Sequence, residues 1–376
     1  MKRFFAMLLL FVMVFGLVAC GGNGETPSDT SSQETQGSTD TSSSTSTDNG
    51  KTEVKGYDDS IDHLFIATDI RAHSIVVYDL DLCDGDFKKL VDDDVALVWE
   101  WDADDDPNCK IKPGAGIDSA KIRYSPYYKK DVMIACSSSG WAGVIDYEKK
   151  SLLWEYKIGD GPHSIELLPN SGDIVVACSS GSTTGKLSIV PLSAGVTKPS
   201  HHIFVPSGHG VQWDPENEWL WVLEFTQVFA CKVEGEGTKN ARLVRINGTG
   251  DNFGGKDASG HAFSPVYGQP GKYWVTAGKL WQFDTETETL TQSFNRFAAY
   301  NANSIKGIAS FSDGTVVETV AGFGGKTAYD WSCGGFRIVT IEWSKGKVKQ
   351  LQPKVTNVYF EDREFYKVQP FNKNYQ

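Results

Sequence analysis

Histidine recurs at long and similar intervals in this chain. His163, His209 and His261 are spaced 46 and 52 residues apart, and Lys306 follows 45 residues later. His163 and His209 each lie six residues before the proline that ends an apolar run, and Lys306 lies six residues before Ser312. His261 follows a glycine, as His209 does. The three histidines and the lysine therefore occupy one place in successive repeats of the sequence.

These residue types can perform acid–base chemistry or bind a polar ligand. The imidazole pKa lies near neutrality, so histidine can act as an acid, a base or a metal ligand. We consider His163 and His209 as candidate catalytic acid and base, and His261 and Lys306 as candidate ligand-binding residues. A purely structural role is the alternative, because a Gly-His pair at the start of a strand can hydrogen-bond a loop carbonyl and only fix local geometry.

The elements that position these residues are short strands. Residues 119–158 read as four strands separated by turns, and 163–192 repeat the pattern with a period of about 45 residues. Four-stranded units of this length predict an all-β fold, a β-propeller of six blades. Seven blades are the alternative if the acidic insertion at 81–118 contains a further unit.

The two ends of the predicted ring complete one blade between them. Residues 63–81 and 96–102 resemble the second, third and fourth strands of a unit whose first strand lies elsewhere. The C-terminal segment 364–371, "EFYKVQPF", is our candidate for the missing strand.

This pattern resembles the quinoprotein-like and NHL-like propeller superfamilies and, more narrowly, uncharacterised propeller lipoproteins of bacteria. The resemblance implies a fold and does not transfer a function. The histidine pattern is similar in outline to propeller polysaccharide lyases and glycosidases, which use channel-face His, Tyr and Arg, sometimes with three histidines on a metal. By that likeness His163, His209 and His261 are candidate ligands of a divalent ion such as Mn²⁺ or Zn²⁺.

Propeller geometry predicts which further residues share a face with the histidines. The innermost strands start on one face, and the loops after the second strands reach the same face. The additional ligand-binding candidates on that face are Arg71, Asp69, Lys121, Glu224, Trp141 and Trp331.

The N-terminus reads as an export signal. Residues 1–19 combine Lys2 and Arg3 with an apolar run, and the ending Leu-Val-Ala-Cys resembles a lipobox in which Cys20 is lipidated. Residues 20–54 are then a Ser/Thr-rich disordered tether, and 55–376 the propeller domain. Acyl chains on Cys20, such as palmitate, predict a bacterial protein anchored to the cell membrane on its extracytoplasmic face.

Charge and cysteines narrow the possible partners. The formal net charge is −12 and no Lys/Arg-rich run is present, which argues against nucleic acid as a partner.

Beyond Cys20, the six cysteines permit disulfides, and Cys83 with Cys109 is our candidate bridge because both lie in polar surroundings. Cys136 and Cys178 lie in apolar strands and are predicted to be core residues.

Three functions are compatible with these features. The first is a tethered module that binds a carbohydrate or another small polar ligand on its channel face. The second is a carbohydrate-active enzyme, and the scarcity of paired carboxylates on that face favours a lyase over a glycosidase. The third is a protein-interaction scaffold. We expect a monomer and assign no cofactor beyond the possible divalent metal.

Overall fold

The computed structural model describes residues 63–180, 184–252, 260–277, 279–292, 305–324, 327–343 and 351–375. Every described residue belongs to one compact unit. The predictions of a signal peptide, of lipidation at Cys20 and of a tether concern residues outside the described part. In the part of the chain that is described, no helix has the length and apolar character needed to cross a membrane.

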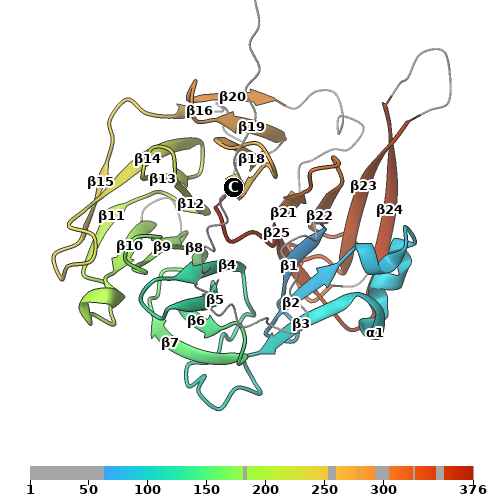
Figure 1. Ribbon diagram of the computed structural model, residues 1–376, viewed down its shortest axis with the longest axis horizontal. Helices are drawn as coiled ribbons and strands as arrows, with labels where there is room; N and C mark the ends of the chain where they lie inside the picture. Colours follow the sequence, from blue (N-terminus) through green and yellow to red (C-terminus); the bar gives the residue numbers. More distant parts are fainter. Residues whose placement is uncertain are drawn as a thin grey trace, which may run out of the picture. The chain divides into compact units, whose positions relative to one another are not determined.

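The described strands form antiparallel sheets, called blades here, which surround a common centre (Figure 1). Blade 1 consists of β25 (Phe365–Pro370), β1 (Leu64–Asp69), β2 (Ser74–Asp79) and β3 (Leu97–Asp102). Blade 2 consists of β4 (Ser119–Ser125), β5 (Lys130–Ser137), β6 (Trp141–Asp146) and β7 (Ser151–Lys157). Blade 3 consists of β8 (Pro162–Leu167), β9 (Ile174–Cys178), β10 (Lys186–Val190) and β11 (His201–Phe204).

The other three blades repeat this order. Blade 4 consists of β12 (Gly210–Asp214), β13 (Trp219–Leu223), β14 (Gln227–Glu234) and β15 (Arg242–Arg245), with β16 (Asp251–Asn252) also paired to β14. Blade 5 consists of β17 (Gly260–Pro265), β18 (Lys272–Ala277), β19 (Leu280–Asp284) and β20 (Thr289–Gln292). Blade 6 consists of β21 (Ile305–Ser310), β22 (Val316–Val320), β23 (Gly335–Trp343) and β24 (Leu351–Tyr359). The predicted six-bladed β-propeller is confirmed.

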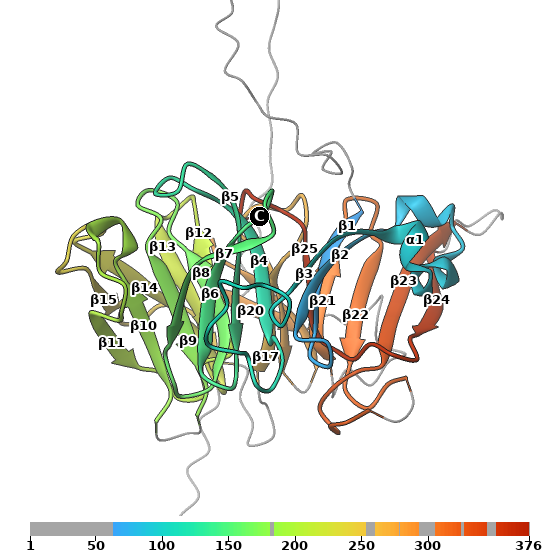
Figure 2. The ribbon, with the colours of Figure 1, turned by 90° about the horizontal axis from the view of Figure 1, so that it is seen from below.

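The first strands of the blades line the centre of the ring. In the order β25, β4, β8, β12, β17 and β21, each contacts the next, and β21 contacts β25 again. Figure 2 shows the ring edge-on, with the strands running between its two faces. We call the centre that the inner strands surround the channel, and buried side chains such as Lys121, Arg123 and Glu166 occupy it. The residues at the starts of the inner strands lie at one end of this centre, which we call its mouth.

The ring is closed by the two ends of the domain. Strand β25 pairs with β1, with Ala67 opposite Val368 and Phe65 opposite Pro370. The prediction that 364–371 supplies the missing first strand is confirmed. Gly307 in β21 permits the close approach of β25, since a Cβ atom there would lie 2.2 Å from the backbone nitrogen of Val368.

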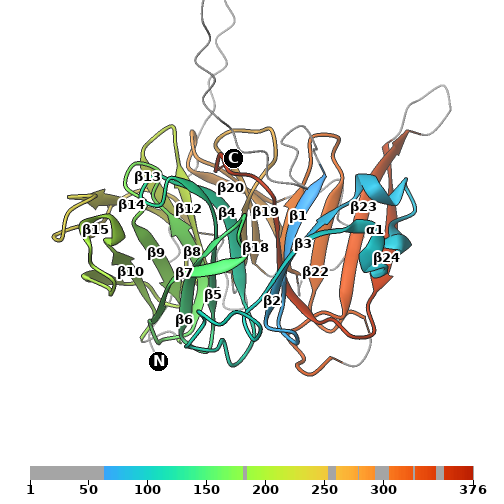
Figure 3. The same cartoon turned by 60° about the horizontal axis from the view of Figure 1, so that its bottom comes forward.

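The acidic insertion contains no further blade within the described residues. It forms short helices, η1 (Asp81–Cys83), η2 (Phe87–Val91) and α1 (Asp93–Ala96), and then a turn-rich segment before β4. Helix η2 lies against β24, and Figure 3 shows α1 beside that strand at the edge of blade 6. Another short helix, η3 (Leu192–Ala194), follows β10.

The apolar core lies between neighbouring blades. Trp101 of β3 stacks on Trp141 of β6 with ring centroids 6.1 Å apart, and Trp99 stacks on Tyr147 at 5.0 Å. These contacts join blade 1 to blade 2. Many strands, such as β9, are buried on both faces, which explains their continuous apolar sequences.

The six described cysteines are free thiols and all are buried. The predicted Cys83–Cys109 disulfide is wrong. Cys83 belongs to the core shared by blades 1 and 6, whereas Cys109 belongs to the core shared by blades 1 and 2. Polar neighbours in the sequence suggested two surface loops, but each loop turns its cysteine into a different interior. Cys136 and Cys178 are core residues, as predicted.

Candidate functional site

One position near the start of each inner strand defines the site, which we call the channel mouth. It is the second residue of five inner strands, and in blade 4 it is His209, directly before β12. Going round the ring from blade 1, the six residues are Tyr366, Ala120, His163, His209, His261 and Lys306. The fold thus brings together the three histidines and the lysine that the repeat spacing singled out.

The three imidazoles contact one another directly. The rings of His163 and His209 are stacked, with centroids 4.6 Å apart and planes 12° from parallel. The ring of His261 meets that of His209 edge-on at 5.1 Å. Lys306 Nζ lies 3.0 Å from His261 Nε2. Side chains from blades 3, 4, 5 and 6 therefore form one continuous arc.

Aromatic side chains extend the arc on its other side. The ring of Tyr366 lies 6.0 Å from that of His163, and the ring of Trp331 meets Tyr366 edge-on at 5.3 Å. Tyr329 stacks on Trp331 at 4.6 Å and is 43% exposed. Ala120 offers only a methyl group at the blade 2 position, so Tyr366 can reach His163 across it. The mouth thus combines titratable groups with an accessible aromatic pair.

Burial keeps two of the histidines neutral near neutral pH. Burial lowers the pKa of His209 well below its usual value, and His163, His261 and Lys367 reinforce the shift. Burial and the nearby Lys306 lower the pKa of His261 to about 3. His209 Nδ1 lies 2.9 Å from the carbonyl oxygen of Ser207 and must donate to it, because a carbonyl only accepts. The Nε2 atom of neutral His209 is consequently a hydrogen-bond acceptor.

Two lysines lie at and below the mouth. Burial lowers the pKa of Lys306 to about 8, with Asp330 opposing the shift, and the residue is 9% exposed. Lys367 of β25 is fully enclosed, and its Nζ donates to the carbonyl oxygens of His163 at 2.7 Å and His209 at 3.1 Å. Burial also lowers the pKa of Lys367 to about 8. Lys367 and Tyr366 are site residues that the sequence analysis missed.

Asp118 places a carboxylate beside His163. Its Oδ1 lies 3.3 Å from His163 Nδ1, and its Oδ2 accepts a hydrogen bond from the backbone N–H of Ser138. The carboxylate is buried, whereas the His163 side chain is 17% exposed. His163 is therefore the imidazole of the stacked pair that reaches solvent more readily.

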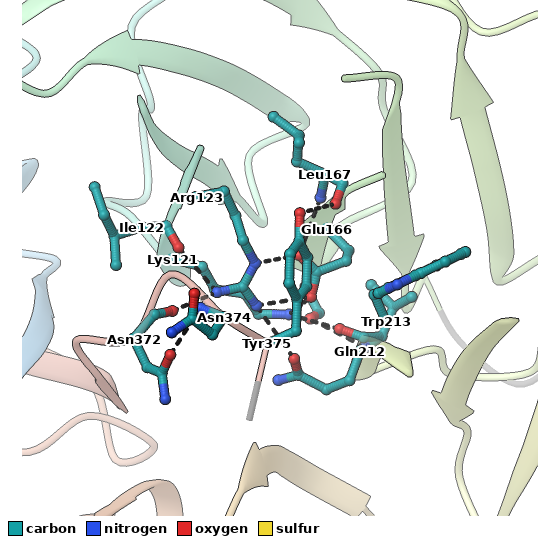
Figure 4. A network of polar contacts seen from close by, with 12 residues as sticks. Lys121, Ile122, Arg123, Glu166, Leu167, Gln212, Trp213, Asn372, Asn374 and Tyr375 are labelled. Atoms are coloured by element: carbon teal, nitrogen blue, oxygen red, sulfur yellow. Dashed lines mark hydrogen bonds and ion pairs between the residues drawn. The ribbon is translucent and has the colours of Figure 1, made fainter. Parts of the chain in front are cut away.

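A second layer of polar residues lies deeper in the channel, nearer the ends of the inner strands (Figure 4). Glu166 accepts from Arg123 Nε at 2.7 Å, from Arg123 Nη2 at 3.0 Å and from Lys121 Nζ at 3.1 Å. Lys121 also donates to the carbonyl oxygen of Val211 at 2.6 Å. Burial alone would raise the pKa of Glu166, but Arg123 and Lys121 lower it. Lys121 is thus committed to an internal ion pair and is buried.

The C-terminal segment caps this deeper layer. Arg123 Nη1 donates to the carbonyl oxygen of Asn372 at 2.8 Å, and the Arg123 guanidinium lies 4.2 Å from the centre of the Tyr375 ring. The Tyr375 hydroxyl donates to the carbonyl oxygen of Leu167, the last residue of β8. Figure 1 shows the chain after β25 running to the centre of the ring. This segment therefore covers the end of the channel opposite the histidines.

Four predicted ligand-binding residues have other roles. Asp69 is buried and accepts from the backbone N–H groups of Arg71, Ala72 and Glu364. Arg71 is exposed and donates to the carbonyl oxygen of Glu361. Glu224 accepts from Gln227. Trp141 is buried between blades, and its Nε1 donates to Glu155. Among the described contacts, none of these four touches the histidine arc.

The metal prediction remains untested. Within the described ranges, no group of three or more His, Cys, Asp or Glu side chains is arranged to hold a metal ion. The imidazoles contact one another through ring faces and edges rather than converging on one point.

The opposite face has a hollow of a different character. It has a volume of about 480 Å³ and lies at the turns that follow the first and third strands of blades 2 to 4. Its lining includes Tyr127, Asn170, Ser171 and Glu236. It lacks the histidines and lysines gathered at the mouth, so we place the candidate site at the mouth.

The fold and the mouth together define a six-bladed propeller with titratable and aromatic side chains at one end of its channel. The chain belongs to the family of unknown function DUF6528, whose model matches residues 90–321. No curated protein matches the chain.

Three of the solved structures that match this chain do so at low sequence identity. The β-propeller domain of Cps50 (Swd1) from Myceliophteria thermophila is 11% identical, with a TM-score of 0.39, covering 64% of this chain and 72% of that one. Hydrazine synthase from Kuenenia stuttgartiensis is 14% identical, with a TM-score of 0.44 and coverages of 71% and 70%. The dihydro-heme d1 dehydrogenase NirN is 10% identical, with a TM-score of 0.40 and coverages of 84% and 57%. These likenesses carry no argument about function.

Proposed function

We propose that this protein is an extracytoplasmic, membrane-tethered propeller lipoprotein that binds a carbohydrate or another small polar ligand at the channel mouth. The observation that supports this most directly is the continuous arc of contacting side chains from Tyr329 to Lys306. It places an accessible aromatic pair, three imidazoles and an ammonium group along one arc.

Such a mixture suits a sugar. The apolar face of a sugar ring packs on aromatic side chains, while its hydroxyls need donors and acceptors at fixed positions. The Tyr329–Trp331 pair offers the aromatic surface. The His163 side chain, which is 17% exposed, contacts Tyr366 on the other side from this pair and offers a polar contact. The nearly buried Lys306 offers another at the far end of the arc.

A glycan array that contains neutral and acidic oligosaccharides tests the binding proposal. We expect the wild-type protein to bind a subset and His163→Ala to lose most of that binding. His202→Ala is the matched control, because His202 is exposed on the outer strand β11. Absence of wild-type binding across the array would overturn the proposal in favour of a protein-interaction scaffold.

The tether has a separate test. If Cys20 is lipidated, labelling of cells with a fatty-acid analogue should modify the wild-type protein and not Cys20→Ser, and the variant should leave the membrane fraction. An unlabelled wild-type protein would contradict the anchor without affecting the binding proposal.

A uronate lyase is the second candidate function. The observation that favours it is Lys306 with a pKa of about 8 next to neutral His261, since one group can donate a proton and the other accept one. In such an elimination a base removes the proton beside the carboxylate, the glycosidic bond breaks, and an acid protonates the leaving oxygen. Growth of ultraviolet absorbance from unsaturated uronates, lost in His261→Gln, would identify this activity.

A further inference from the structure

We propose that the ligand of the channel mouth carries an anionic oxygen group, a carboxylate or a phosphate, which supplies the countercharge that Lys306 and Lys367 lack. This inference rests on the proposed function and names the chemical class of the ligand.

The balance of charges along the channel is uneven. Four cationic side chains lie in it, two in the deeper layer and two at or just below the mouth. In the deeper layer, Glu166 pairs with both Lys121 and Arg123. Within the described residues, neither Lys306 nor Lys367 has a carboxylate oxygen within 4.0 Å of its Nζ. Their contacts are to neutral acceptors, an imidazole nitrogen for Lys306 and two carbonyl oxygens for Lys367.

The nearby carboxylates of Asp118 and Asp330 do not form ion pairs with these two lysines. Asp118 faces His163, and it stabilises charged Lys367 only at longer range. Asp330 stabilises charged Lys306 in the same way and is exposed to solvent. A buried ammonium group without an adjacent anion is energetically unfavourable. The lowered pKa of both lysines reflects that cost, yet at pH 7 both remain largely protonated.

A bound anion would relieve this cost. The His163 side chain is 17% exposed, whereas Lys306 is nearly buried at 9%, so a bound anion would meet His163 at the surface of the mouth and Lys306 just beneath it. Lys367 is held below by two backbone carbonyls, and it acts on the anion through its charge alone. The imidazoles of His209 and His261 are neutral near pH 7, so they neither attract nor repel the anion by a net charge. Together with the Tyr329–Trp331 surface, this arrangement fits an acidic saccharide better than a neutral one.

Matched ligands test the inference. Titration calorimetry at neutral pH and low salt would compare oligogalacturonate with its neutral methyl ester, and inorganic phosphate would be tested separately. We expect the acid to bind at least about tenfold more tightly than the ester, because one charge-assisted hydrogen bond is worth about that factor. Lys306→Met should abolish the preference, Lys306→Arg should retain most of it, and Lys198→Met, on the exposed surface, should leave it unchanged.

Failure of the inference can be told apart from failure of the proposed function. Equal affinity for acid and ester, or a preference that persists in Lys306→Met, would overturn the anion site while leaving saccharide binding intact. If no saccharide binds, the effect of inorganic phosphate on the melting temperature tests the anion site by itself. A rise in melting temperature with phosphate over sodium chloride of equal ionic strength, lost in Lys306→Met and kept in Lys306→Arg, would support the anion site alone. No such rise would overturn it.

Discussion

Three imidazoles can lie in contact only if most of them are uncharged, because adjacent imidazolium ions repel and a buried one lacks solvation. The cluster of His163, His209 and His261 meets that condition because burial keeps His209 and His261 uncharged near neutral pH. The arc is therefore organised for hydrogen bonding near neutral pH, and acid should disturb it before it disturbs the apolar cores between blades.

The first prediction at the residue scale concerns acid sensitivity. The pKa of His261 is about 3 in the folded protein and about 6.5 in an unfolded chain. Between these values the unfolded state binds more protons, so the free energy of unfolding falls as the pH drops from about 6.5 toward 3. His261→Gln should reduce the loss of stability between about pH 7 and pH 4.5, measured by urea unfolding. An unchanged pH dependence would contradict this account.

The second prediction concerns Glu166. Glu166→Gln leaves the buried Lys121 and Arg123 without their shared anion and should lower the free energy of unfolding by about 3–5 kcal/mol. Glu148→Gln is the control, since Glu148 is exposed, and it should change stability by less than about 0.5 kcal/mol. Chemical denaturation of both variants measures the difference, and similar losses would argue against the pair.

At the scale of elements, β25 is the strand on which the ring depends. It supplies the first strand of blade 1, and its Phe365 and Val368 are fully buried in the core shared with blade 6. It also supplies Tyr366 and Lys367 to the mouth. Loss of this one strand would therefore open the ring and also remove Tyr366 and Lys367 from the site.

Two C-terminal truncations test this role. A chain ending at Glu364 lacks β25, and we expect it to lose cooperative thermal unfolding and near-ultraviolet circular dichroism. A chain ending at Pro370 retains β25 and loses the cap with Tyr375 together with the core residue Phe371, so it should unfold cooperatively at a lower temperature. If the shorter chain unfolds like the full-length protein, β25 does not close the ring.

The sequence revealed the blades better than the site. Repeat counting located the blades because each unit carries the same strand and turn pattern, and it aligned His163, His209 and Lys306. It missed Tyr366 because the closing strand was recognised without being aligned to the other first strands. It did not separate Arg71 and Glu224 from the arc, because spacing along the chain does not encode which side chains touch across the ring. The contact of Trp141 with Trp101 was equally hidden, because the two residues lie in different blades.

At the scale of the whole molecule, we expect the described cysteines not to react with thiol reagents while the protein is folded. Burial raises the pKa of Cys109, Cys178 and Cys231 to about 12, and thiolate is the reactive form. We expect a Cys20→Ser protein to react with a thiol reagent such as DTNB only after unfolding, and then at six sites. Reductant should leave its melting temperature unchanged. A drop in melting temperature would reveal a disulfide.

Closure by β25 also has a consequence for biosynthesis. A hydrogen bond joins the backbone of Lys367 to Thr68 across a separation of 299 residues. Blade 1 therefore cannot form until nearly the whole chain has been synthesised, and contacts this distant in sequence form slowly. Until then β1, which pairs with β2 on one side, has its other edge unpaired and open to association with other chains.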